Sequence, residues 1–239
     1  MSATAIIAAF NEEQTLAEVL TALQRNPLID EIIVVSDGST DRTVEIARGF
    51  EVRTIALREN QGKGCAMRIG VEHATNDILF FVDGDMLGIT DQHIETLVLP
   101  VTGGDCDMNV GIRHRGPVLD FFHLKAHFGP VLSGIRVMHR EVFESVPVMY
   151  MERFKIEAAL NYFCARAGFR QRNTVIRDLG HVIKEHKLGW TAGVSRRMAM
   201  SREVFIVIID LNLFQTWRWF DSSDLPSAEY DLFEAELAE

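Results

Sequence analysis

The sequence contains few cysteines and no long apolar run. Its three cysteines, Cys65, Cys106 and Cys164, are widely separated, which fits neither a complete disulfide set nor the paired spacing of a zinc site. This pattern predicts reduced thiols and a cytoplasmic protein. No stretch approaches the ~18 apolar residues of a membrane span, and no basic and apolar targeting segment stands at the start. We therefore expect a protein that is not secreted and does not span a bilayer by itself.

Positive charge is also scarce. Twenty-four Lys and Arg face 34 Asp and Glu, giving a net charge of -10. An acidic chain is repelled by a phosphate backbone, so we expect no nucleic-acid partner, and any basic function must be local. With 239 residues, 47% of them hydrophobic, the chain is long enough for one α/β domain with appendages.

Apolar runs alternate with segments of helical periodicity in the first half of the chain. Strands are expected at 4–10, 31–36, 52–57 and 77–83. Helices are expected at 16–23, 43–50 and 64–74. This alternation predicts an α/β fold with a mostly parallel central sheet flanked by helices.

The second half is less regular. Strands are expected at 108–112 and 174–179, and helices at 140–146 and 156–167. An apolar and aromatic run at 204–220 precedes an acidic tail, expected to be mobile or to depend on a partner. We expect a catalytic domain at 1–190, with a donor half at 1–115 and an acceptor half at 116–190, followed by a C-terminal helical extension and acidic tail at 191–239.

Carboxylates follow three of the expected strands. Asp83-Gly84-Asp85 comes directly after one strand, Asp37 after another, and Glu12 after the first. Strands of an open α/β sheet end at a common edge, so these acids are expected to converge on one ligand. Carboxylate oxygen suits a hard divalent cation, which neutralises a diphosphate leaving group. Acidic turns and helix caps are the ordinary alternative, and Asp41 and Glu13 are better explained as helix-start residues.

These motifs resemble those of family 2 glycosyltransferases. The resemblance rests on Phe10-Asn11-Glu12-Glu13, Asp37-Gly38-Ser39-Thr40-Asp41, Asn60-Gln61-Gly62-Lys63-Gly64 with Ala66 and Gly70, and Asp83-Gly84-Asp85, and covers about the first 115 residues. The chain is most similar in appearance to the branch that transfers hexoses to polyprenyl or dolichyl phosphates. This resemblance implies a type A, Rossmann-like fold and an inverting, metal-dependent hexosyltransferase that uses a UDP- or GDP-linked sugar.

The resemblance also implies roles for individual residues. Phe10, Asn11, Glu12 and Asp37 are expected to bind the nucleoside, Asp83 and Gly84 to contact the nucleotide or sugar, and Asp85 to bind Mg or Mn. Asp83 and Asp85 are therefore expected to be catalytic. Lys63 stands between two glycines at a helix start, which suits donor binding, although an ordinary helix entry also explains the pattern.

The acceptor half offers one acid and several cations. Glu157 lies in an aromatic-x-x-Glu pattern similar to that of the family, and is the expected acceptor-side acid. A hydroxyl acceptor needs such a base, whereas a phosphate acceptor does not. For a phosphate, Arg113, Arg115 and Arg136 become the expected ligands, unless they only neutralise neighbouring acids.

A basic element late in the catalytic domain is similar to one in many relatives. We expect His186 and Lys187 to bind acceptor or phosphate, with a solvated turn as the alternative for Lys187. His181 is better explained as a core or capping histidine than as a ligand. The run at 204–220 fits a helix buried in a homodimer, or one that lies on the cytoplasmic face of a membrane.

The sequence thus predicts a glycosyltransferase with a nucleoside-diphosphate sugar donor and an acceptor that includes polyprenyl phosphate among its candidates. A glycan or small-molecule acceptor and a non-catalytic nucleotide-binding scaffold stay open. A sugar-1-phosphate nucleotidyltransferase is disfavoured, because Phe10-Asn11-Glu12-Glu13 stands where that class has a glycine-rich, arginine-containing loop.

Overall fold

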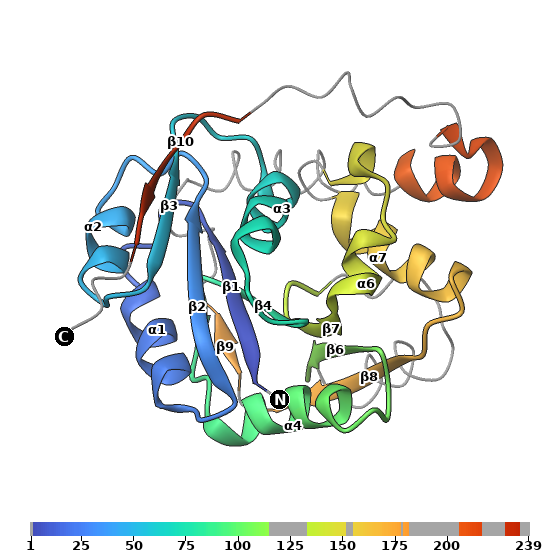
Figure 1. Cartoon of the computed structure of the whole chain (residues 1–239), viewed down its shortest axis with the longest axis horizontal. Coiled ribbons are helices and arrows are strands. Elements are labelled where there is room, and N and C mark those ends of the chain that lie inside the picture. The colour runs from blue at the N-terminus through green and yellow to red at the C-terminus, as the bar shows by residue number, and fades with distance from the viewer. Residues whose placement is uncertain are drawn as a thin grey trace.

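The fold is a three-layer α/β sandwich around one large sheet (Figure 1). The computed structural model describes residues 2–114, 133–151, 155–177, 179–181, 206–216 and 228–234. Its main sheet has eight strands in the order β10-β3-β2-β1-β4-β7-β6-β8, and β5 and β9 form a separate pair. The strands are β1 (Ala3–Ala9), β2 (Ile29–Ser36), β3 (Arg53–Leu57), β4 (Ile78–Asp83), β5 (Met86–Leu87), β6 (Met108–Arg113), β7 (Arg136–His139), β8 (Gln171–Ile176), β9 (Gly180–His181) and β10 (Tyr230–Phe233).

Helices cover both faces of this sheet. They are α1 (Leu16–Arg25), α2 (Thr43–Arg48), α3 (Lys63–His73), α4 (Asp91–Thr102), α6 (Arg140–Glu144) and α7 (Lys155–Arg166), with a 3-10 turn η1 (Val148–Tyr150) and a π-helical turn η2 (Asp210–Phe214). The α1, α2 and α4 helices share one core with the sheet, and α3, α6 and α7 pack on the opposite face.

Most neighbouring strands run parallel, which confirms the predicted fold class. The pairs β1–β2, β1–β4, β2–β3 and β6–β8 are parallel, whereas β10 and β7 pair antiparallel with their neighbours. Because β7 lies antiparallel between β4 and β6, these two strands point the same way. The carboxyl ends of β1, β2, β4 and β6 therefore lie at one edge of the sheet.

Alternating burial explains why the apolar runs fold as central strands. In β4, Ile78, Phe80 and Val82 face the core that contains α1 and α4, and Leu79 and Phe81 face the core that contains α3 and α7. A strand buried on both faces needs apolar side chains at every position.

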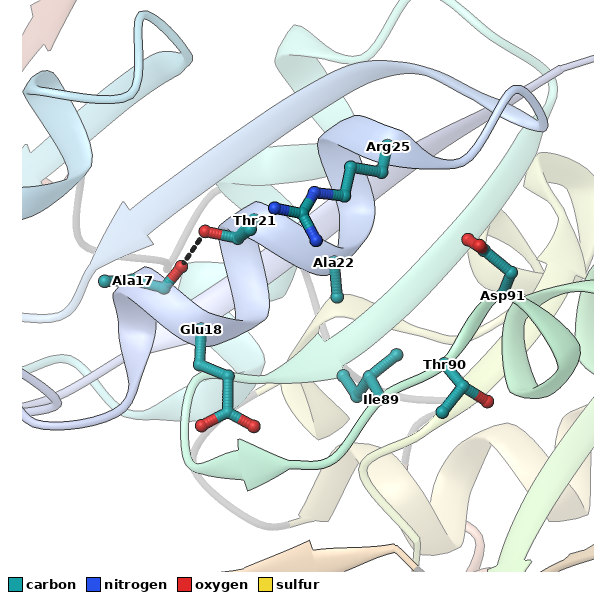
Figure 2. Close-up of a pocket in the computed structure, with 8 residues that line it drawn as sticks. All are labelled: Ala17, Glu18, Thr21, Ala22, Arg25, Ile89, Thr90 and Asp91. Atoms are coloured by element: carbon teal, nitrogen blue, oxygen red, sulfur yellow. Dashed lines mark hydrogen bonds between the residues drawn. The ribbon is translucent and has the colours of Figure 1, made fainter.

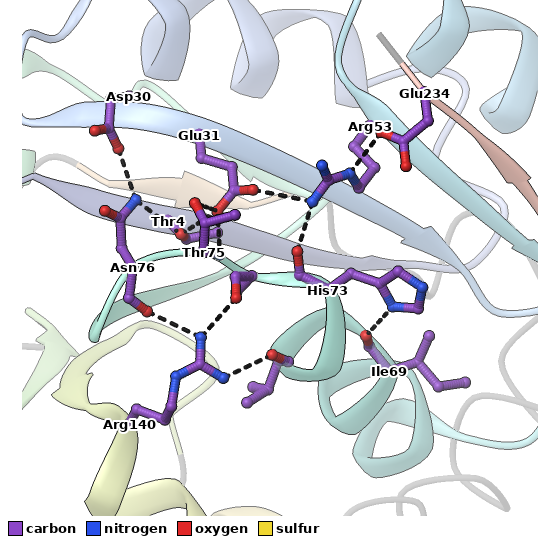
Figure 3. Close-up of polar contacts among 12 residues, drawn as sticks. Thr4, Asp30, Glu31, Arg53, Ile69, His73, Thr75, Asn76, Arg140 and Glu234 are labelled. Carbon is purple, nitrogen blue, oxygen red and sulfur yellow. Dashed lines mark hydrogen bonds and ion pairs between the residues drawn. The ribbon is translucent and has the colours of Figure 1, made fainter.

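A polar network links the elements at the amino ends of the parallel strands, at the side of the sheet opposite their carboxyl ends (Figure 3). Glu31 pairs with Arg53 at 3.0 Å and accepts a hydrogen bond from the Thr75 amide at 2.8 Å. The Arg140 guanidinium donates to the carbonyls of Val71, Ala74 and Asn76 at 2.7 to 3.0 Å. Val71 lies in the last turn of α3, and Ala74 and Asn76 follow the helix, so these contacts fix the chain where α3 ends, and we assign this network to stability.

Several expectations about residues beyond β4 need correction. Both β7 and α4 form where the sequence predicted no element, and β8 begins three residues earlier than the expected strand at 174–179. Residues of the acidic tail were expected to be mobile or partner-dependent, yet β10 joins the edge strand β3 of the main sheet. Its neighbours Glu229 and Glu234 pair with Arg58 at 2.6 Å and Arg53 at 2.8 Å. These pairs neutralise the tail where it meets the sheet.

Within the predicted C-terminal extension at 191–239, residues 206–214 are helical. Val207 and Leu211 are buried in the core that contains α6 and α7, and the Tyr150 hydroxyl donates to Asp210. Leu213 and Phe214 are 74% and 68% exposed, so part of the segment leaves apolar surface uncovered. The aromatic residues at 217–220 lie outside the described residues. None of the helices in the described ranges is long and apolar enough to cross a membrane.

Candidate functional site

Three acidic loops meet at the carboxyl edge of the sheet. The β1–β2 register pairs Ala9 with Ser36, and the β1–β4 register pairs Ala8 with Asp83. The residues that follow these strands are therefore neighbours, although they lie far apart in the sequence. This convergence is the arrangement that the sequence predicted.

Asp37 is held by the loop that precedes α3. Its carboxylate is 4% exposed and accepts hydrogen bonds from the Gln61 and Gly62 amides at 2.7 and 2.9 Å. Burial raises the pKa of Asp37, and the two amide hydrogen bonds oppose that rise. The approach depends on Gly38, whose φ is +68° and where a Cβ would lie 2.6 Å from the Asn60 nitrogen. The loops at 37–38 and 60–62 thus form one rigid unit.

Asn11 joins the first loop to the second. Its side-chain oxygen accepts from the Thr40 backbone amide at 2.9 Å, and the Asn11 backbone amide donates to the Ser39 hydroxyl at 3.1 Å. Asp41 accepts from the Thr43 amide at 2.9 Å, as expected for a helix-start residue. Phe10 is partly buried beside these loops, at the end of β1. The contacts therefore place Phe10 and Asn11 in the same loop cluster as Asp37.

Glu12 lies against the acidic motif at the end of β4. Glu12 and Asp85 are only 3% and 6% exposed. The Thr15 hydroxyl donates to the Gly84 carbonyl at 2.7 Å, and a Cβ on Gly84 would lie 3.3 Å from Cγ of Glu12. Gly84 is therefore the residue that lets the loop after β4 pass close to Glu12. Thr15 was not predicted, because a threonine before a helix looks like an ordinary cap.

Lys63 contacts two of the predicted acids. Its ammonium lies 2.7 Å from Asp83 Oδ1 and 2.7 Å from Glu157 Oε1. Burial alone would lower the pKa of Lys63, but the attraction of Asp83 and Glu157 outweighs burial and raises the pKa. The two acids come from the donor and acceptor halves, so Lys63 joins those halves at the site.

Arg136 is buried beneath the same cluster. Its side chain is fully enclosed and donates to the Ser133 carbonyl at 3.1 and 2.7 Å, while Nη1 has no hydrogen-bond partner among the described residues. Burial lowers the pKa of Arg136, and the charges of Glu157 and Asp83 oppose that change. The turn at 133–135 also brings the Gly134 backbone close to Asp83, since a Cβ on Gly134 would lie 2.0 Å from Asp83 Oδ2.

Of the other predicted cations, the structure describes only Arg113. Arg113 is the last residue of β6 and so lies at the same edge as Asp83, two strands away. Arg115, His186 and Lys187 lie outside the described residues.

The backbone just after the Asp83-Gly84-Asp85 motif pairs with the strand β9. The β5–β9 register places His181 opposite Met86, the residue after Asp85. No group of three or more His, Cys, Asp or Glu side chains suited to a metal ion occurs among the residues that the structure describes. The buried oxygens of Asp85 nevertheless fit Mg or Mn, which proteins often bind through one or two carboxylates with substrate phosphates completing the shell.

A separate open pocket lies between α1 and the segment after β5 (Figure 2). It has a volume of about 510 Å³, and Glu18, Arg25, Thr90 and Asp91 are among its lining residues. None of the predicted site residues lines it. Its mixed charges favour neither an anion nor a cation, so we assign no ligand to it.

An α/β sheet whose neighbouring strands end in buried carboxylates is the architecture of type A glycosyltransferases. The family model for glycosyl transferase family 2 matches residues 4–171, and the chain belongs to this family.

Curated relatives match only part of the chain. An uncharacterized glycosyltransferase, YaiP, from Escherichia coli is 42% identical over 93 residues, covering 37% of this chain and 23% of the relative. The dolichyl-phosphate beta-glucosyltransferase of Drosophila melanogaster is 41% identical over 96 residues, covering 34% of this chain and 29% of the relative. The chain thus matches less than a third of the length of either protein.

Solved structures match the fold over nearly the whole chain. Glucosyl-3-phosphoglycerate synthase from Mycobacterium tuberculosis, in complex with Mn2+, UDP and phosphoglyceric acid, has a TM-score of 0.74 at 21% identity, covering 99% of this chain and 88% of that one. Its complex with Mg2+ and UDP has a TM-score of 0.73 at 22% identity, covering 88% and 79%. At this identity the likeness concerns the fold.

Proposed function

We propose that this protein is an inverting, metal-dependent glycosyltransferase that moves a hexose from a UDP- or GDP-linked sugar to an acceptor. The observation that carries the proposal is the convergence of Glu12, Asp37, Asp83 and Asp85 at one sheet edge. Asp37 and Asp83 have structural partners in the Gln61 and Gly62 amides and in Lys63, but four carboxylates at one sheet edge still concentrate negative charge there. A ligand that brings hydrogen-bond donors and a cation offsets that charge.

In this proposal the donor lies across the carboxyl ends of β1, β2 and β4. Asp37 and Glu12 accept hydrogen bonds from the nucleoside, with Phe10 and Asn11 beside it. The rigid contact between Asp37 and the amides of Gln61 and Gly62 supports this role, because it fixes the carboxylate before the nucleotide arrives.

We further propose that the buried Asp85 holds a Mg or Mn ion. When bound, the ion neutralises charge that develops on the diphosphate leaving group. The solved relative binds UDP with either Mn2+ or Mg2+, which supports this assignment.

For the acceptor we propose a phosphate-bearing molecule, with polyprenyl phosphate as the first candidate. Two observations support it: a partial match to a dolichyl-phosphate glucosyltransferase, and a fold neighbour crystallised with phosphoglyceric acid. The cation Arg113 at the same edge also suits phosphate. The exposed Leu213 and Phe214 would then meet a lipid surface or a second copy of the chain. A glycan or small-molecule acceptor is the alternative.

The proposal is tested by turnover with purified protein. The protein is incubated with UDP- and GDP-linked glucose or mannose, Mn2+ and a short polyprenyl phosphate in detergent, and products are identified by mass. We expect one donor to give a glycosylated lipid phosphate, and Asp85→Ala to abolish the metal-dependent turnover. Equal turnover by Asp85→Ala would remove the metal assignment. Transfer to a glycan but not to lipid phosphate would select the alternative acceptor.

A further inference from the structure

The ammonium of Lys63 bridges three separate elements at the site. Lys63 is the first residue of α3, Asp83 is the last of β4, and Glu157 lies in the first turn of α7. Both acid oxygens are 2.7 Å from the same nitrogen, and the side chains of Lys63 and Glu157 are only 16% and 12% exposed. Such partly buried, charge-assisted contacts are short and directional.

The same contacts limit what else Lys63 can bind. A lysine ammonium has three hydrogen-bond donors, and the two carboxylates already take two of them. A donor diphosphate could reach only the third donor of this nitrogen, unless it displaced one of the two carboxylates. Removing that carboxylate from its partner would leave its charge uncompensated in a poorly solvated place.

Asp83 is restrained from the opposite side as well. The Gly134 backbone lies against its carboxylate, and the buried Arg136 fixes that turn through the Ser133 carbonyl. With Lys63 on one side and Gly134 on the other, the Asp83 carboxylate has little freedom. Lys63 then sets where Glu157 and α7 stand relative to Asp83.

We propose that Lys63 is a positioning residue that fixes the acceptor-side carboxylate of Glu157 against the donor-side carboxylate of Asp83, and that it is not a ligand of the donor diphosphate. The inference rests on the proposed function, because it assigns the two acids to opposite substrates. It differs from the sequence-based expectation that Lys63 binds the donor.

The test compares Lys63→Met, Lys63→Arg and Glu157→Gln with the unaltered protein. The control is Arg68→Met, which also removes a cation from α3 but breaks only contacts within that helix, the ion pair with Glu72 and a long contact with the Cys65 thiol. Three quantities are measured: affinity for UDP with Mn2+ by calorimetry, hydrogen exchange of α7 by mass spectrometry, and the kcat and KM of transfer.

For Lys63→Met we expect UDP affinity within about threefold of the unaltered protein and faster exchange in α7. We expect kcat to fall on the order of a hundredfold, the scale of a misplacement of about 1 Å. In Lys63→Arg, α7 should exchange more slowly than in Lys63→Met. In Glu157→Gln, α7 should exchange faster than in the unaltered protein, as in Lys63→Met. Arg68→Met should change none of the three quantities.

The proposal is overturned if UDP affinity falls more than about tenfold, roughly 1.4 kcal/mol, in Lys63→Met while α7 exchange keeps its original rate. That result would make Lys63 a diphosphate ligand. If Lys63→Met fails to fold, the same measurements on Glu157→Gln and Lys63→Arg test the proposal. Unchanged hydrogen exchange of α7 in Glu157→Gln also overturns it. Exchange and UDP binding do not require turnover, so a protein that transfers no sugar refutes the proposed function without deciding the role of Lys63.

Discussion

Replacing Gly134 with alanine is expected to disable the site without unfolding the protein. The added Cβ would lie 2.0 Å from Asp83 Oδ2 and 2.4 Å from Asp83 Cγ. Ordinary contact begins near 3.4 Å, so the carboxylate or the turn must move by more than 1 Å. The turn is anchored by Arg136 at the Ser133 carbonyl, so most of the movement falls on Asp83.

A displacement of this size breaks the contact between Asp83 and Lys63. We expect kcat/KM for transfer to fall on the order of a hundredfold, because misplacing a reacting group by about 1 Å has that effect. Overpacking at this one position should cost about 1–3 kcal/mol, which shifts the midpoint of thermal unfolding by several degrees without abolishing folding.

The assay is steady-state transfer combined with thermal unfolding of each variant. Gly49→Ala is the matched control, since Gly49 has a right-handed helical conformation and a Cβ there meets its nearest neighbour at 3.4 Å. Both variants should fold, and only Gly134→Ala should lose activity. Activity of Gly134→Ala within threefold of Gly49→Ala would refute the contact between Gly134 and Asp83.

Three other predictions concern separate parts of the molecule. Asp37→Ala should weaken UDP or GDP binding at least tenfold in a calorimetric titration, because it removes a nucleoside partner and leaves the Gln61 and Gly62 amides without their acceptor; unchanged affinity would remove Asp37 from the site. Arg140→Met should destabilise the fold by about 2 kcal/mol in urea unfolding, through three lost carbonyl contacts, and leave nucleotide affinity unchanged. Deleting residues 228–239 should cost less than about 2 kcal/mol, since β10 is a four-residue edge strand, the Arg58–Glu229 pair is exposed and the Arg53–Glu234 pair is partly exposed; failure of this shortened chain to fold would contradict a peripheral role for β10.

The sequence predicted the first half of the fold well because its signals there are local. Apolar runs mark β1, β2 and β4; Glu12 follows β1 in the next loop, Asp37 directly follows β2, and Asp83 is the last residue of β4. A parallel sheet then requires those ends to share an edge. These two facts predict that Glu12, Asp37 and the Asp83-Gly84-Asp85 motif lie at the same edge of the sheet.

The features that the sequence did not predict depend on distant partners. The strand β7 has only four residues, begins with the charged Arg136, and forms by pairing with β4 and β6, which lie far from it in the sequence. The strand β10 lies in an acidic stretch and joins the sheet beside Arg53 and Arg58, which precede it by more than 170 residues. The Lys63 contact with Glu157 spans 94 residues. Local patterns carry no information about such pairings.

The most direct test of the central claim is calorimetric binding of UDP and GDP, each with and without Mn2+, to the unaltered protein and to Asp85→Ala. If the acids at the strand ends form a metal-dependent donor site, one nucleotide will bind more tightly with Mn2+, and Asp85→Ala will lose that gain while keeping its fold. Binding of neither nucleotide, or an equal gain from Mn2+ in Asp85→Ala, would contradict the account.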